Sequence, residues 1–142
     1  MPTTVLIADD DTVSRGLIRM VLEYDGCRCL EAEDGTATLS VLGKHHIDLL
    51  ILDYMMPKLT GVEVLQTLYQ SSHLEPLPTI MITGMLQPSI REMAIQLGVF
   101  AILEKPYDLG ELRALVAHIG TTDKSSEPEG LLTSFQKPAS FR

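Results

Sequence analysis

The chain has 142 residues, 45% of them hydrophobic but only 5% aromatic, so we expect a single domain with an aliphatic core. Its formal charge of -8 disfavours direct binding of nucleic acid, which needs clustered Lys and Arg, and suits the binding of cations. No apolar run reaches the roughly 20 residues of a membrane-spanning helix and no secretory signal is evident, so we expect a cytoplasmic protein that makes no membrane contact.

Five short aliphatic runs predict β-strands, at residues 5–8, 27–32, 49–52, 79–82 and 100–103. Aliphatic runs with little polar alternation are typical of strands that are buried on both faces of a parallel sheet. The second run contains both cysteines, Cys27 and Cys29. A single C-x-C pair is a weak metal signal, so we expect two reduced thiols.

Apolar residues between these runs repeat with the period of an α-helix. The first repeat comprises Val13, Leu17, Met20, Val21 and Tyr24. Later repeats cover residues 61–69, 90–97 and 109–119, and a shorter, less regular segment covers 36–44. Local signals agree with these helices: Thr60 with Glu63 predicts a capping box, Asp11 an N-cap, and Gly98 a C-terminal stop.

The alternation of five strands with five helices predicts an α/β fold, with a parallel sheet covered by helices on both faces. Right-handed crossovers leave a few doubly wound strand orders. Among these we adopt, by analogy, the flavodoxin-like order 2-1-3-4-5. We expect this domain to span residues 1–119. Residues 120–142 begin with the polar stretch GTTDKSSEPEG and are expected to form a flexible C-terminal tail or linker.

Polar residues follow four of the aliphatic runs. Asp9 and Asp10 follow the first run, Asp53 the third, Thr83 the fourth and Lys105 the fifth. Ligands of open parallel sheets bind at the carboxyl ends of the strands, so these side chains are expected to share one crevice. Clustered carboxylates repel one another unless a cation binds, and Mg²⁺ prefers carboxylate oxygens together with phosphate. The pattern therefore predicts a site for a divalent cation and a phosphoryl group, with one carboxylate as nucleophile.

Four segments, LIADDD, LLILDYMMPKLTG, IMITG and ILEKPY, resemble the signature segments of response regulator receiver domains of two-component signalling. The resemblance covers about residues 3–119. It implies that Asp53 accepts a phosphoryl group. It also implies that Mg²⁺ or Mn²⁺ is held by Asp9, Asp10, Asp53 and the backbone carbonyl of Met55.

The resemblance also assigns the residues that respond to the phosphoryl group. Thr83 matches the hydroxyl that grips it, Lys105 matches the lysine that pairs with it, and the bond from Lys105 to Pro106 is cis in this family. Ile102 departs from the pattern, because most members carry Tyr or Phe there and move that ring when the threonine moves. Either another residue, such as Tyr107, serves this switch, or its readout is weaker.

The implied function is a phospho-accepting domain of a His-to-Asp phosphorelay. A sensor histidine kinase or phosphotransfer protein would donate the phosphoryl group. The face of the fourth helix, fifth strand and fifth helix would then bind a downstream protein, an output domain absent from this chain, or a second copy in a homodimer. A stand-alone, chemotaxis-regulator-like receiver and the receiver part of a longer regulator both remain open.

Two other functions compete with this one. A haloacid-type phosphatase shares an Asp nucleophile but uses D-x-D, and Met55 replaces the second Asp here. A flavin or nucleotide carrier needs a phosphate-cradling loop after the first strand, where this chain has three aspartates. We therefore expect no enzyme beyond its own phosphoryl transfer and a slow dephosphorylation, since the bulky Met55 and Met85 would hinder an attacking water.

Overall fold

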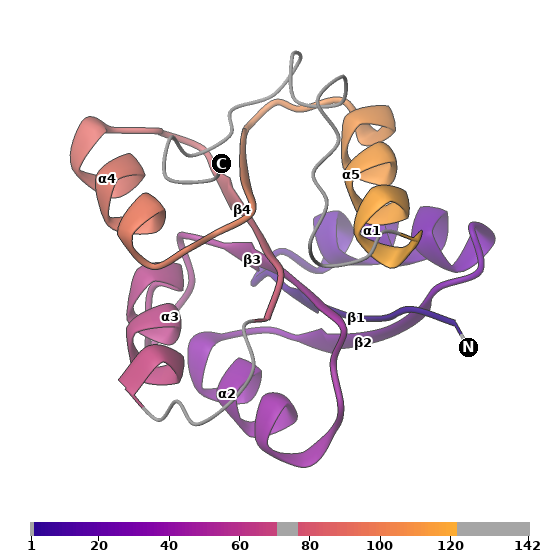
Figure 1. The fold of residues 1–142 in the computed structure, drawn as a ribbon, viewed down its shortest axis with the longest axis horizontal. Coiled ribbons are helices and arrows are strands. Elements are labelled where there is room, and N and C mark those ends of the chain that lie inside the picture. The colour runs from indigo at the N-terminus through magenta and orange to yellow at the C-terminus, as the bar shows by residue number, and fades with distance from the viewer. Residues whose placement is uncertain (1, 71–76, 122–142) are drawn as a thin grey trace.

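The computed structural model describes residues 2–70 and 77–121 of the chain, and strands and helices alternate throughout this part (Figure 1). The strands are β1 Thr4–Ala8, β2 Arg28–Ala32, β3 Leu49–Asp53, β4 Thr79–Thr83 and β5 Ala101–Glu104. The helices are α1 Thr12–Tyr24, α2 Gly35–Lys44, α3 Gly61–Gln70, α4 Pro88–Gln96 and α5 Leu109–Thr121. Every predicted element is present. No helix in the described ranges is long and apolar enough to cross a membrane.

The five strands form one parallel sheet in the order β2-β1-β3-β4-β5, which confirms the predicted flavodoxin-like topology. Figure 1 shows α1 and α5 together on one face of this sheet and α2, α3 and α4 on the other. The strand order places β3 at the centre of the sheet, with β1 beside it, and both faces of these two strands are covered. Residues that follow these two strands consequently meet at one edge of the sheet.

Two apolar clusters fill the spaces between the sheet and its two helical layers. Successive side chains of a strand point to opposite faces, so each strand contributes to both clusters. The cluster under α1 and α5 takes from the strands Val5, Ile7, Cys29, Leu49, Ile51, Ile80, Ile82, Ala101 and Leu103. The cluster under α2, α3 and α4 takes Leu6, Ala8, Ala32, Leu50, Leu52, Met81 and Ile102. This burial on both sides explains why the sequence shows aliphatic runs without polar alternation.

The helix ends follow the predicted local signals. The carboxylate of Asp11 accepts a hydrogen bond from the Val13 N–H and forms the N-cap of α1. The Thr60 and Glu63 side chains each accept a hydrogen bond from the other's backbone N–H, at 3.2 and 2.8 Å, and form the expected capping box. Gly98, just after α4, has a φ of 78°, which favours glycine. These contacts set where the loops around the sheet edge begin.

The buried face of α1 is not the stripe that the first apolar repeat suggests. Four members of that repeat are exposed, with Tyr24 reaching 86%: Val13, Leu17, Met20 and Tyr24. The buried residues are Ile18 and Leu22, which pack into the cluster under α1 and α5. The helix carries two apolar stripes, and the rotation that buries Ile18 and Leu22 also brings Arg15 of the same face against Glu31 of β2. That ion pair favours the observed orientation of α1 over the one that would bury the first apolar repeat.

Candidate functional site

The register of the sheet brings the predicted carboxylates together at its carboxyl edge. Asp9 and Asp10 directly follow β1, and Asp53 ends the neighbouring β3. One carboxylate oxygen from each of the three lies within 4.8 Å of the other two. The side chains of Asp9 and Asp53 are buried, whereas Asp10 is exposed. The cluster thus has a buried base and an open side, as a site that admits a ligand from solvent requires.

Lys105 completes this cluster from the end of β5. Its Nζ lies 2.9 Å from Oδ2 of Asp53, while Oδ1 of Asp53 accepts a hydrogen bond of 3.0 Å from the Met55 N–H. The Lys105 backbone N–H donates to the carbonyl of Thr83 at 2.8 Å, which holds the backbone of this residue beside β4. The peptide bond between Lys105 and Pro106 is cis, as the resemblance implied. Both oxygens of Asp53 are therefore held by donors.

The charges of the cluster do not balance. Burial raises the pKa of Asp53, and the Asp9 charge adds to this effect; the hydrogen bonds from Lys105 and Met55 oppose it without cancelling it. Burial lowers the pKa of Lys105, but its hydrogen bond to Asp53 and the charges of Asp53, Asp9 and Asp10 outweigh burial and hold the pKa above its usual value. The Lys105 ammonium alone does not neutralise the carboxylates, so the site favours a further cation.

Thr83 lies next to this cluster with its hydroxyl engaged by its own loop. The hydroxyl donates to the Met85 carbonyl and accepts from the Met85 N–H, both at 3.2 Å. Alternation along β4 places the buried Thr83 in the row of Met81, whereas Asp53 pairs with Ile82 in the opposite row. The strand order thus places Thr83 on the strand beside Asp53, but among the described residues its hydroxyl bonds only to Met85, in the loop after β4.

Ile102 and Tyr107 differ sharply in their surroundings. Ile102 is fully buried in the cluster under α2, α3 and α4. Tyr107 is partly buried against the opposite cluster, and burial, followed by the charges of Asp9 and Asp53, raises its pKa to about 12. The Tyr107 phenol is therefore protonated at neutral pH and available as a donor near the acidic edge. Its part in a switch stays a prediction.

The loop after β3, which carries Met55, packs against the start of α2. The Asp34 carboxylate lies 3.4 Å from Nζ of Lys58, a residue with a φ of 72°. The Gly35 N–H donates to the Pro57 carbonyl at 3.4 Å. A Cβ atom at Gly35 would lie only 2.4 Å from Cβ of Leu59. These contacts could not be predicted from the sequence, because they join two loops that are distant along the chain.

Replacing Gly35 with alanine is expected to destabilise the fold by roughly 1–3 kcal/mol, because the new methyl group overpacks the contact with Leu59. Gly43 in the same helix has nothing within 4 Å of an added Cβ, so Gly43→Ala should stabilise by up to about 1 kcal/mol. Urea denaturation of both variants measures the two shifts. Equal midpoints for Gly35→Ala and the wild type would contradict the close contact.

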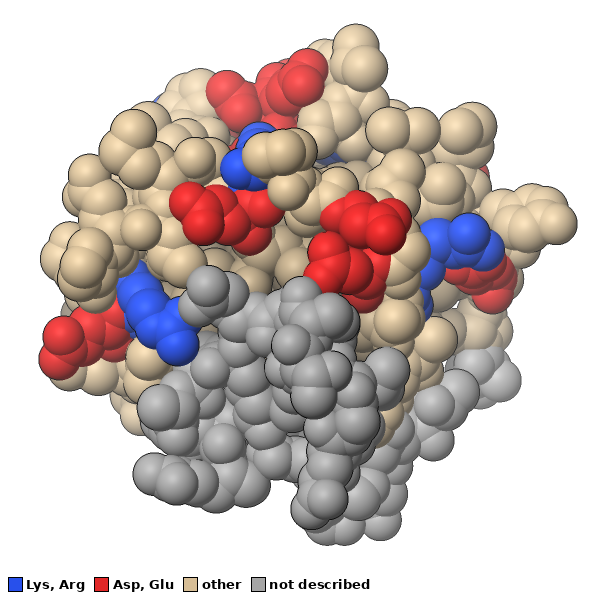
Figure 2. Space-filling view, turned by 90° about the horizontal axis from the view of Figure 1, so that it is seen from above, with Lys and Arg blue, Asp and Glu red and all other residues tan. Residues whose placement is uncertain are grey.

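The surface of the molecule matches the acidic balance of the sequence. Figure 2 shows Asp and Glu side chains in several separate groups on the face seen from above, with few Lys and Arg side chains beside them. The formal charge of the whole chain is -8. The described residues on this face therefore offer no basic patch of the kind that binds nucleic-acid phosphates.

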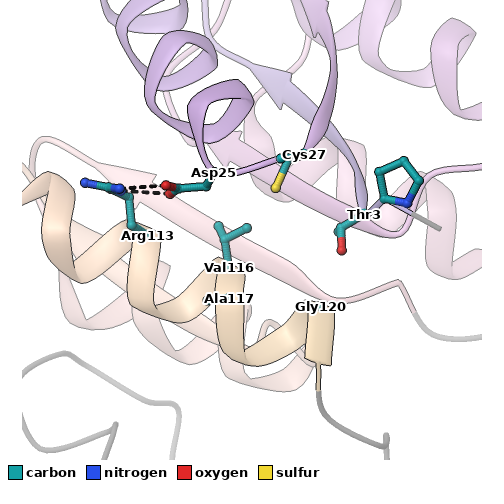
Figure 3. Close-up of a pocket in the computed structure, with 9 residues that line it drawn as sticks. Thr3, Asp25, Cys27, Arg113, Val116, Ala117 and Gly120 are labelled. Atoms are coloured by element: carbon teal, nitrogen blue, oxygen red, sulfur yellow. Dashed lines mark hydrogen bonds and ion pairs between the residues drawn. The ribbon is translucent and has the colours of Figure 1, made fainter.

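A hollow of about 330 Å³ lies at the opposite edge of the sheet from the carboxylate cluster, between α5, the start of β1 and the turn after α1 (Figure 3). Arg113 of α5 forms two hydrogen bonds to Asp25 beside it, at 2.8 and 2.6 Å. The thiol of Cys27 also lines it; burial, then the Asp25 charge, raises its pKa. Both cysteines are free, as predicted. The charges that line this hollow are paired and its thiol is weakly acidic, so the hollow does not favour catalysis.

Comparison with known proteins decides the family. The family model described as "Response regulator receiver domain" matches residues 5–117, which is most of the chain. The chain belongs to this family. Among curated relatives of the receiver, Response regulator MprA of Mycobacterium sp. (strain KMS) is 33% identical over 114 residues, covering 80% of this chain and 49% of the relative. Transcriptional regulatory protein CpxR of Escherichia coli (strain K12) is 36% identical, covering 81% and 48%.

Solved receiver structures have the same fold. Chemotaxis response regulator CheY4 of Vibrio cholerae superimposes with a TM-score of 0.77 at 25% identity, over 84% of this chain and 99% of that one. This chain spans about half the length of MprA and CpxR. Receiver domains are signalling phospho-acceptors that are phosphorylated on an aspartate and bind Mg²⁺ at an acidic pocket.

Proposed function

We propose that Asp53 is the phospho-acceptor of this receiver domain and that Asp9, Asp10 and Asp53 hold the divalent cation, Mg²⁺ or Mn²⁺. The observation that carries the proposal is the meeting of three carboxylates within 4.8 Å with the Lys105 ammonium 2.9 Å from Asp53. Carboxylate oxygens fit a hard divalent cation, and the resemblance adds the Met55 carbonyl as a further ligand. A bound cation neutralises the charge that develops on the phosphoryl oxygens.

The acceptor reaction follows from the contacts of Asp53. One of its oxygens attacks the phosphorus of a phosphohistidine, the P–N bond breaks, and the electron pair returns to the departing imidazole. The Met55 N–H orients Oδ1 of Asp53 before the reaction. Lys105 is already beside Oδ2 and transfers its ion pair to a phosphoryl oxygen. The product is an acyl phosphate on Asp53.

The switch would begin at the loop after β4. The Thr83 hydroxyl leaves Met85 and donates to a phosphoryl oxygen, which frees the backbone of Met85. The same loop is also held by a 3.3 Å hydrogen bond from the Leu86 N–H to Glu104 of β5. A change in this loop therefore acts on the face of α4, β5 and α5 and shifts its population toward a partner-binding state. Tyr107 would act in place of the absent aromatic ring.

The proposed setting is a phosphorelay in the cytoplasm. The donor is a sensor histidine kinase or phosphotransfer protein, and the acceptor of the signal is a downstream protein, an output domain or a second copy of the chain. Residues 1–119 form the receiver, and the predicted tail or linker at 120–142 lies, from residue 122 on, outside the described residues. The chain acts on no other substrate. Dephosphorylation is slow, because the bulky apolar side chains of Met55 and Met85 hinder the attacking water. They lie two residues after Asp53 and Thr83 and are 64% and 65% exposed.

Acetyl phosphate tests the proposal without a partner kinase. With Mg²⁺ present, mass spectrometry should find one phosphoryl group per chain, and a borohydride-trapped digest should place it on Asp53. Prior removal of divalent cations with a chelator should abolish the modification, and added Mg²⁺ should restore it. Size measurement of the same sample tests dimerisation. Labelling at another residue, or labelling that is indifferent to the chelator, would count against the assignment.

A further inference from the structure

Arg15 lies at the point where the buried face of α1 passes over the ends of β1 and β2. The same face buries Ile18 one helical turn later. Arg15 is charged, yet its side chain is only 13% exposed. Its Nε donates to Oε1 of Glu31 at 2.6 Å, and a second guanidinium nitrogen donates to the backbone carbonyl of Asp9, also at 2.6 Å. A guanidinium presents its donors in one rigid plane, so these two bonds fix each other's direction.

The carbonyl that Arg15 contacts lies just beyond the regular sheet. The last residue of β1 paired with β2 and β3 is Ala8, so the ladder ends before Asp9. The carbonyl of Asp9 belongs to the peptide group that leads into Asp10. Arg15 therefore fixes the plane of the peptide that joins two of the three clustered carboxylates, while the Asp11 N–H holds Oδ1 of Asp9 at 2.9 Å.

Arg19 offers a natural comparison on the same helix. It also pairs with Glu31, at 2.6 Å, and with Glu23, at 2.9 Å, but among the described residues it makes no hydrogen bond to the loop after β1. Both arginines carry one positive charge and share an acidic partner. They differ in that only Arg15 bridges from Glu31 to the Asp9 carbonyl.

We propose that Arg15 is a positioning residue for the divalent cation: it holds the peptide between Asp9 and Asp10 so that their carboxylates converge with Asp53. This inference rests on the proposed function, because it assumes that these carboxylates bind the cation. A positioning role predicts that replacing Arg15 with a neutral residue changes the Mg²⁺ affinity in the direction opposite to the effect of charge alone. Removing a positive charge near a cation site should tighten binding, whereas loss of positioning should weaken it.

The test is calorimetric titration of Mg²⁺ into the whole chain, without a phosphoryl donor, for the wild type, Arg15→Met and Arg19→Met. We expect Arg15→Met to bind Mg²⁺ about tenfold more weakly than the wild type, the lower end of what outer-shell changes cost. Arg19→Met removes the same charge from the same helix and should bind as tightly as the wild type or more tightly. Thermal melting without Mg²⁺ should show a similar small loss for both, since both variants lose an ion pair with Glu31.

Arg15→Lys keeps the charge and most of the buried stem, and it decides the matter even if Arg15→Met fails to fold. A single ammonium cannot reproduce the planar fork, so Mg²⁺ binding should weaken several-fold in Arg15→Lys. Affinity in the Arg15 variants equal to or tighter than in Arg19→Met would overturn the positioning role while leaving the metal site intact. Absence of Mg²⁺ binding in the wild type would instead overturn the proposed metal site, and this inference with it.

Discussion

Replacing Asp53 with asparagine should abolish phosphorylation by acetyl phosphate and, in the absence of divalent cations, should stabilise the fold. The amide is a poor nucleophile and cannot form the acyl phosphate, so we expect no phosphoryl group by mass spectrometry. The stabilisation follows from the pKa of Asp53, which burial and then the Asp9 charge hold above its usual value despite Lys105 and Met55. A raised pKa means that the folded environment disfavours the carboxylate relative to the unfolded chain.

The raised pKa of Asp53 determines how the stability difference between Asp53→Asn and the wild type changes with pH. The penalty from ionised Asp53 is fully present above its pKa in the folded state and absent below its unfolded value of about 3.9. The stability advantage of Asp53→Asn should therefore shrink as the pH falls through that interval. Urea denaturation at a series of pH values measures it. An advantage that persisted unchanged at low pH would contradict the buried-charge explanation.

Asp25→Asn is the matched control, with the same chemical change at the opposite edge of the sheet. The hydrogen bonds from Arg113 hold the pKa of Asp25 below its usual value, so this carboxylate stabilises the fold. Its contribution is present above the unfolded pKa and is lost as the pH falls through the folded one. Asp25→Asn should therefore lower stability at neutral pH and leave phosphorylation intact, the reverse of Asp53→Asn in both respects.

Replacing Lys105 with methionine should slow phosphorylation by about 100-fold, the size of the effect when one charge-stabilising donor is removed from an active site. The same change should tighten Mg²⁺ binding, because the ammonium and the cation compete for Asp53, Asp9 and Asp10. The rate of modification by acetyl phosphate and the calorimetric Mg²⁺ affinity measure the two effects. A parallel loss of rate and affinity would show instead that Lys105 only supports the loop.

The stability of Lys105→Met should depend on Mg²⁺. Breaking a buried ion pair costs about 3–5 kcal/mol, but Lys105 is 37% exposed, so solvent screening reduces the expected loss to about 1 kcal/mol. Mg²⁺ at a hundred times its dissociation constant stabilises by about 2.7 kcal/mol, which more than offsets this loss. Lys44→Met removes an exposed lysine from the last turn of α2, outside the site, and serves as control, with an unchanged phosphorylation rate.

The sequence was most informative where chain order alone decides position. Aliphatic runs followed by Asp9, Asp53, Thr83 and Lys105 predict strand ends, and in a parallel sheet the strand ends share one edge. The structure brings the carboxylates and Lys105 together there. Local chemistry was equally readable: the capping box that begins with Thr60 depends on residues only three apart.

The sequence was less informative where the outcome depends on contacts between distant segments. Periodicity identified α1 as a helix, but it could not choose between the stripe of Val13 and Leu17, which is exposed, and that of Ile18 and Leu22, which is buried. The bond from Arg15 to the Asp9 carbonyl involves a backbone atom and leaves no signature in residue types. Such contacts follow from how helices rotate on the sheet.

The placement of α5 has a consequence for synthesis on the ribosome. Leu112, Leu115 and Val116 of this last described helix are almost completely buried against the face of the sheet that it shares with α1. Every described strand is translated before them, so a nascent chain contains all five strands while the apolar surface that α5 covers is still exposed to water. We expect such a chain to attract chaperones until α5 emerges and docks.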